Sequence, residues 1–106
     1  MSTDKERQKL PYKIALFISM EESQPFFAEL VKRSKQTAEK LGAVLTVSYG
    51  DSLAAQQMAQ INAQIKLGVD ALVINPVDHT IGPIVEKANL AGIPIFSVDR
   101  ALGVTK

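Results

Sequence analysis

The chain has 106 residues, enough for one domain with one hydrophobic core. Its hydrophobic content of 46% is ordinary for a globular protein, and its net charge of +1 with scattered Lys and Arg residues argues against a nucleic-acid surface. The sequence has no cysteine, which excludes disulfides and thiolate chemistry. No apolar run approaches the roughly 20 residues that a membrane-spanning helix requires.

The chain begins with a polar, charged segment, Met1–Lys9, which lacks the apolar core of a signal peptide. We expect residues 1–12 to form a disordered lead-in and residues 13–106 to form one lobe. The first strand is expected over Lys13–Ile18, because this run is apolar nearly throughout.

A helix is predicted after the loop that follows this strand. Pro25 suits its first turn, where the missing N–H is not needed, and Gly42 would end it. The side that faces the core is marked by residues at helical spacing, namely Phe26, Phe27, Leu30, Val31, Ser34, Ala38 and Leu41.

Two more strand–helix units follow the same pattern. The second strand is expected at about Val44–Ser48, with Asp51 or Ser52 as the N-cap of the next helix. The third strand is expected at about Ala71–Ile74, with Thr80 as the N-cap of its helix. The buried sides of these two helices are marked by Ala54, Met58, Ile61 and Ile65 and by Ile81, Ile84, Val85 and Ala88.

The fourth strand, Ile93–Val98, is predicted to be covered on both faces, with Gly92 at the C′ position of the preceding helix. It would deliver Asp99 and Arg100 to the carboxyl edge of the sheet, where open α/β sheets bind ligands. Strands that alternate with helices indicate a parallel sheet with helices on both faces. The last strand has no helix after it, so its apolar edge would be open to pairing with another chain.

Several chemistries lack their motifs. The loop after the first strand has no phosphate-binding glycine pattern, and no nucleophile elbow is present for a hydrolase. A receiver domain would need a phosphorylatable Asp where the third strand ends, and this position has Asn75-Pro76. His79 is interpreted as a solvated loop residue. We therefore expect no enzyme activity, no cofactor and no metal site.

The remaining function is recognition of a small polar ligand at the carboxyl edge. The candidate residues combine aromatic rings with polar groups, as small-molecule pockets do: Gln24, Phe26, Phe27, Asp99 and Arg100. Structural alternatives stay open for each of them. Adjacent helical residues point about 100° apart, so one of the two Phe residues would belong to the core. Asp99-Arg100 could form a structural ion pair, and Asn75-Pro76 a turn.

Three motifs together resemble the N-terminal lobe of type I periplasmic sugar-binding proteins, especially the ribose-binding branch. They are Gln-Pro-Phe-Phe at 24–27, Ile-Asn-Pro-Val-Asp at 74–78 and Gly-Ile-Pro-Ile-Phe-Ser-Val-Asp-Arg at 92–100. The resemblance implies a flavodoxin-like three-layer αβα lobe with a parallel four-stranded sheet of order 2-1-3-4. It also implies a non-enzymatic protein that binds a ribose-like pentose or a hexose for an ABC transporter, in the periplasm or outside the cell.

By this resemblance, Phe26 and Phe27 would stack on the sugar, while Asp99 and Arg100 would hydrogen-bond its hydroxyls and ring oxygen. Gln24 departs from the asparagine that the family usually has. The family's second lobe is absent from this sequence, so we expect weak binding by the lobe alone. A homodimer could form through the exposed sheet edge or the former interlobe face.

Two other functions remain open at this point. One is the effector-binding core of a lactose-repressor-type regulator, which shares the fold, although Met1–Lys9 is too short for a helix-turn-helix. The other is a single-lobe scaffold that binds no ligand.

Overall fold

The computed structural model describes residues 11–21 and 24–98. Its strands are β1 (Lys13–Ile18), β2 (Val44–Tyr49), β3 (Ala71–Ile74) and β4 (Ile95–Ser97). They form one parallel four-stranded sheet in the order β2-β1-β3-β4. The predicted flavodoxin-like topology is therefore confirmed. The expected lead-in, apart from residues 11 and 12, lies outside the described residues.

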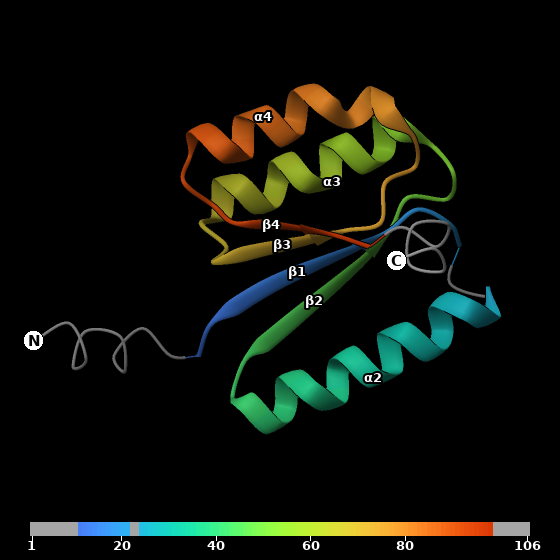
Figure 1. Cartoon of the computed structure of the whole chain (residues 1–106), viewed down its shortest axis with the longest axis vertical. Coiled ribbons are helices and arrows are strands. Elements are labelled where there is room, and N and C mark those ends of the chain that lie inside the picture. The colour runs from blue at the N-terminus through green and yellow to red at the C-terminus, as the bar shows by residue number, and fades with distance from the viewer. Residues whose placement is uncertain (1–10, 22–23, 99–106) are drawn as a thin grey trace, which may run out of the picture.

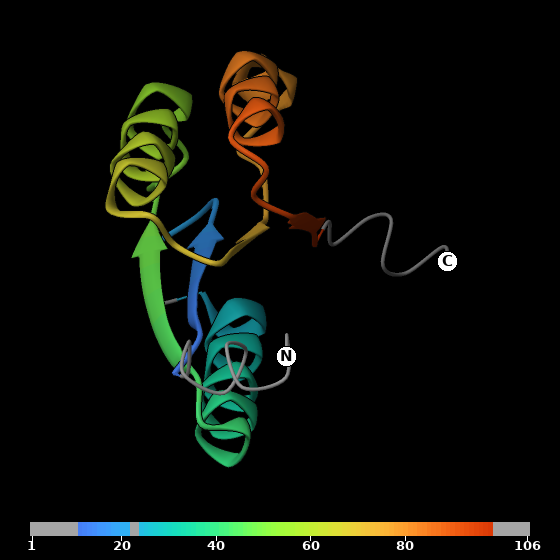
Figure 2. The same ribbon diagram turned by 90° about the vertical axis from the view of Figure 1, so that its left-hand side faces the viewer.

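The helices are α2 (Pro25–Leu41), α3 (Ala54–Leu67) and α4 (Gly82–Leu90), with a short 3-10 turn, η1 (His79–Ile81), before α4. Figures 1 and 2 show α3 and α4 on one face of the sheet and α2 on the other, below β1 and β2. The three-layer αβα arrangement is thus present. The α2 side of β3 and β4 has no covering helix in the part of the chain that the structure describes.

Each face of the sheet has its own hydrophobic cluster. The α3/α4 face buries a set of almost fully inaccessible side chains, namely Ala15, Phe17, Ile61, Val69, Leu72, Ile74, Ile81 and Ala88. The α2 face buries a smaller set, Leu16, Ile18, Phe27 and Val31. Alternate residues of β1 thus supply both cores, which is why this central strand is apolar nearly throughout.

Glycines end the first two helices as predicted. Gly42 and Gly68 adopt φ angles of 74° and 78°, in the left-handed region that favours glycine. The N–H of Ala43 donates to the carbonyl of Ala38 at 2.9 Å, which closes the end of α2. Gly92, with φ of 77°, has the same role directly after the last turn of α4.

Both predicted N-caps are wrong. Leu53 is the N-cap of α3, because Asp51 and Ser52 are in a left-handed turn with φ of 52° and 63°. Thr80 lies inside η1, whose N-cap is Asp78, and α4 begins only at Gly82. The sequence pattern missed this extra turn because Asp78 and Thr80 are both ordinary capping residues.

The fourth strand is shorter than predicted, and it is not covered on both faces. The N–H of Ile93 closes the end of α4 on the carbonyl of Ala88, and Pro94 has no N–H to donate. Regular pairing therefore begins at Ile95. Phe96 is 58% exposed, since α2 does not reach this part of the sheet.

Candidate functional site

The carboxyl edge is built from the residues that directly follow the strands. Figure 1 shows the ends of the strands on the same side of the molecule as the start of α2. Backbone hydrogen bonds continue the sheet here, since the N–H of Asn75 donates to the carbonyl of Phe17 and that of Val98 to Ile74, each at 2.8 Å. The loops that carry the predicted site thus begin from a fixed edge.

Asn75 is buried, with 5% of its surface exposed, and its side chain joins two neighbouring strand ends. Its Oδ1 accepts the N–H of Ser19 at 2.9 Å, and its Nδ2 donates to the carbonyl of Val98 at 2.7 Å. Turn formation was the structural alternative for Asn75-Pro76. It does not explain why the Asn75 side chain bonds to both neighbouring strand ends.

Gln57 of α3 is fully buried behind the same edge. Its Nε2 donates to the carbonyl of Asn75 at 2.9 Å, and its Oε1 accepts the N–H of Val77 at 2.8 Å. Sequence reasoning missed this residue. The signal was a polar residue at helical spacing between Ala54 and Ile61, on the side of the helix that was expected to be apolar.

Phe26 and Phe27 open α2, and their rings meet edge to face with centroids 5.0 Å apart and planes at 81°. Phe27 is 2% exposed and packs in the α2-face cluster, whereas Phe26 is 48% exposed. One of the two residues therefore belongs to the core. A ligand contact for either ring stays a prediction.

Gln24 is half-buried at the N-terminus of α2. Its carbonyl accepts the N–H of Ala28 at 2.9 Å, the first bond of the helix, while its side chain makes no capping bond. Asp99 and Arg100 lie outside the described residues. Val98, which directly precedes Asp99, is held at the sheet edge by two hydrogen bonds.

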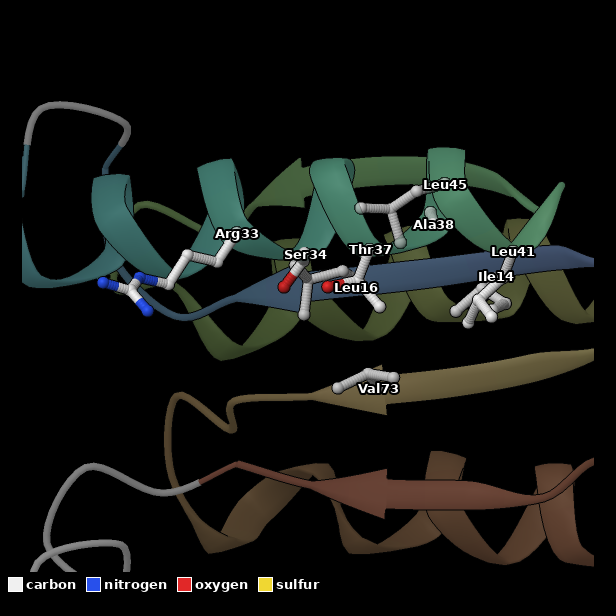
Figure 3. A pocket seen from close by; sticks show the side chains of 9 residues that line it. All are labelled: Ile14, Leu16, Arg33, Ser34, Thr37, Ala38, Leu41, Leu45 and Val73. Carbon is white, nitrogen blue, oxygen red and sulfur yellow. The ribbon is translucent and has the colours of Figure 1, made fainter.

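One groove lies on the α2 face, and another hollow lies at the carboxyl edge itself, on its α4 side. A groove of about 300 Å³ runs between α2 and the sheet, with α2 side chains along one side and Val73 of β3 on the other (Figure 3). A second hollow of about 450 Å³ lies beside β4 and α4, lined in part by Asp78, His79 and Ser97. His79 is exposed, as expected for a solvated residue.

Among the described residues, Asp78 and Glu29 have carboxyl groups with a lowered pKa, and both groups are on the surface. The Thr80 hydroxyl, followed by the Thr80 N–H, donates to Asp78 and lowers the pKa of that carboxyl. The pKa of Glu29 is lowered by a hydrogen bond and the charge of Arg33, one turn along α2. The described residues contain no group of three or more side chains that could hold a metal ion. None of the described helices is long and apolar enough to cross a membrane.

Comparison with known proteins places the chain in a family. The model of the periplasmic binding protein domain matches residues 14–106. This chain belongs to that family. It corresponds to the N-terminal lobe of a type I periplasmic sugar-binding protein, as the three motifs predicted.

Three relatives illustrate the match. The ribose import binding protein of Bacillus subtilis is 36% identical over 78 residues, covering 73% of this chain and 26% of that protein. The D-apiose import binding protein of Actinobacillus succinogenes is 34% identical over 83 residues, covering 76% of this chain and 26% of that protein. An ABC transporter solute binding protein from Mycobacterium smegmatis, solved with bound glycerol, has a TM-score of 0.76 at 31% identity, covering 84% of this chain and 31% of that chain.

The chain therefore spans between about a quarter and a third of the length of the relatives it matches. The comparisons support the fold and the family, while the ligand contacts of Gln24, Phe26, Phe27, Asp99 and Arg100 remain predictions.

Proposed function

We propose that this chain is a monosaccharide-binding lobe of an ABC-importer solute-binding protein and not an enzyme. The observation that carries the proposal is its similarity, over about three quarters of its length, to import binding proteins for ribose and D-apiose. Both of those ligands are pentoses. We therefore propose a ribose-like pentose as the first ligand to test and hexoses as the second.

The sugar would bind at the carboxyl edge, between the start of α2 and the segment that follows Val98. Phe26 has an exposed ring that could cover the apolar C–H face of a sugar. Phe27 packs against Phe26 and would set the orientation of its ring, with little surface of its own to offer. Asp99, Arg100 and Gln24 would supply the polar contacts with the hydroxyls and the ring oxygen.

Binding by this lobe alone would be weak. A half-site lacks the opposing wall of a closed cleft, and each absent hydrogen bond removes about 1 kcal/mol. A dissociation constant in the millimolar range, or about −4 kcal/mol, is therefore the expected scale. The ABC permease, and a periplasmic or extracellular location, are proposals that follow from the family.

The binding test is a titration of the whole chain with D-ribose, followed by amide NMR. The proposal predicts shifts at Phe26 and at residues 98–100 that saturate at millimolar sugar. Asp99→Ala should abolish these shifts and leave the remaining spectrum unchanged, whereas Glu86→Ala, on the exposed side of α4, should bind like the parent. Unchanged affinity in Asp99→Ala would refute the site assignment.

The alternatives predict different outcomes. A scaffold without a ligand would give a dispersed spectrum that no sugar perturbs. The effector-binding core of a lactose-repressor-type regulator is not favoured, because the relatives described above are named as import and transporter binding proteins.

We also propose that two copies associate through the α2 side of β3 and β4. Val73 and Phe96 are opposite one another in the sheet register, and Phe96 exposes 58% of its surface there. A second copy would cover this apolar face and could also pair with the outer edge of β4, which has no neighbouring strand among the described residues.

A further inference from the structure

We propose that Asn75 is a positioning residue for the sugar site, because its side-chain amide ties together the two strand ends that carry the two halves of that site. This inference rests on the proposed function and extends it to a residue that would not touch the sugar.

The geometry places Asn75 between the two halves. Ser19, Asn75 and Val98 are each the first residue after a strand, and their strands β1, β3 and β4 are neighbours in that order. The central residue thus reaches both sides. Its Oδ1 accepts the N–H of Ser19 at 2.9 Å, and its Nδ2 donates to the carbonyl of Val98 at 2.7 Å.

The side-chain amide of Asn75 acts like a backbone peptide group at the point where the backbone hydrogen bonds of the sheet end. The last backbone bonds across this edge run from Asn75 N–H to Phe17 and from Val98 N–H to Ile74, each at 2.8 Å. Beyond them, one neighbour presents an N–H and the other a carbonyl. A carboxamide offers an acceptor and a donor at once, whereas a carboxylate offers only acceptors. Asparagine therefore matches both neighbours.

Both tied residues lead directly into the proposed site. Ser19 starts the loop that leads to Gln24 and to Phe26 in the first turn of α2, and Val98 is bonded covalently to Asp99. The side chain of Asn75 therefore holds the starting points of the two segments that would carry the stacking ring and the carboxylate. Binding groups that are fixed before the ligand arrives lose less conformational freedom on binding, so this tie would raise the sugar affinity.

Gln57 offers a matched control in the same buried network. It bonds to the carbonyl of Asn75 and the N–H of Val77, and none of its bonds is to Ser19 or Val98. Gln57→Glu and Asn75→Asp each convert a buried amide to an acid and remove the NH2 group that donates one of its hydrogen bonds. Only Asn75→Asp loses the donor that binds Val98 at the end of β4, whereas Gln57→Glu loses the donor to the carbonyl of Asn75.

The experiment measures D-ribose affinity by NMR titration of the folded protein, together with the urea unfolding midpoint. Both variants should be less stable than the parent. Asn75→Asp should weaken ribose binding by about tenfold, and Gln57→Glu should change it by less than about twofold. Equal effects of the two variants on affinity, or no effect of Asn75→Asp, would overturn the inference.

A second readout separates this inference from the proposed function. Without sugar, Asn75→Asp should speed the hydrogen exchange of the Val98 amide more than Gln57→Glu does, because only Asn75→Asp removes the bond to the Val98 carbonyl. The Ser19 amide keeps an acceptor in Asn75→Asp and should exchange as in the parent. If the parent binds no ribose, the proposed function fails, and the exchange rates alone decide whether Asn75 holds the edge. If Asn75→Asp does not fold, Asn75→Ser is compared with Gln57→Ser, because a serine is too short to reach both neighbours.

Discussion

The two faces of the sheet differ in the kind of side chain at the end that no helix covers. On the α3/α4 face, the row of side chains across β2, β1, β3 and β4 is Thr46, Ala15, Leu72 and Ile95. The helices cover its middle, where Ala15 and Leu72 are 1% and 0% exposed, and the exposed end has a polar threonine. This row therefore has no large apolar side chain at its exposed β2 end.

On the α2 face, the corresponding row is Val47, Leu16, Val73 and Phe96. Coverage decreases along it from Leu16, which is 2% exposed, to Phe96, which is 58% exposed. The uncovered end thus has an aromatic ring where the other face has a threonine. Helix α2 therefore does not cover its face of the sheet as far as β4, and this uncovered part is the surface that we assign to a partner.

The largest expected effect is on stability, when one phenylalanine on each face is truncated and the two losses are compared. Phe17→Ala, at a fully buried position of the α3/α4 face, should lower the free energy of unfolding by about 3–5 kcal/mol. Phe96→Ala should cost about 1 kcal/mol or less, because its ring is largely in water. Urea unfolding at low protein concentration measures both. Equal losses would contradict the difference between the faces.

A second prediction tests the hydrogen bonds of the buried Gln57 side chain on the α3/α4 face. Gln57→Ala leaves the buried carbonyl of Asn75 and the partly buried N–H of Val77 without their partner, at up to about 1–3 kcal/mol for each group. Gln56→Ala, one residue earlier on α3, removes a half-buried side chain that bonds to the carbonyl of Tyr49. The Gln57 variant should therefore unfold at clearly lower urea concentration. Similar midpoints would show that the buried network adds little.

A third prediction tests the uncovered part of the α2 face by introducing a charge at Phe96. Phe96→Asp should shift the chain towards monomer in sedimentation velocity, because a carboxylate in a buried interface is costly to desolvate. Leu90→Asp is the control, since Leu90 is 81% exposed on α4, away from the α2 face. A parent chain that is monomeric at high concentration would refute the proposed self-association.

The smallest expected effect concerns the turn that leads into α4. The lowered pKa of Asp78 means that its contribution to stability is present above the pKa of the unfolded chain and is lost as the pH falls through the lower folded pKa. Thr80→Val removes the hydroxyl donor, so the pKa of Asp78 should rise towards its ordinary value. Thr80→Ser keeps a hydroxyl and should raise it less. An NMR pH titration of the Asp78 side chain measures the change, and an identical pKa in both variants would contradict the assigned cause.

Much of the topology could be predicted because it follows from local patterns. Apolar runs located β1 and β3, and glycines at helical ends required positive φ wherever the chain turned into a strand. The N-caps could not be predicted, because Asp51, Ser52, Asp78 and Thr80 all suit caps and turns equally well. For α4, the short turn η1 takes Asp78 as its N-cap and includes Thr80, so Thr80 does not cap the helix.

The candidate site could be predicted only as a set of residues near one edge. Sequence order indicates that the ends of parallel strands meet there, but it does not show which side chains reach across. Asn75 and Gln57 form their bonds with residues 18 to 56 positions away, so no local pattern contains this information. The burial of Phe27 and the exposure of Phe26 also required the packing of α2 against the sheet.

We propose that the carboxyl edge of this lobe binds a monosaccharide. The most direct measurement is the amide NMR spectrum of the whole chain during a titration with D-ribose. We expect saturable shifts confined to the start of α2 and to residues 98–100, with the amides of the α2 face around Phe96 unchanged. A well-dispersed spectrum that neither ribose nor a hexose perturbs at millimolar concentration would contradict it.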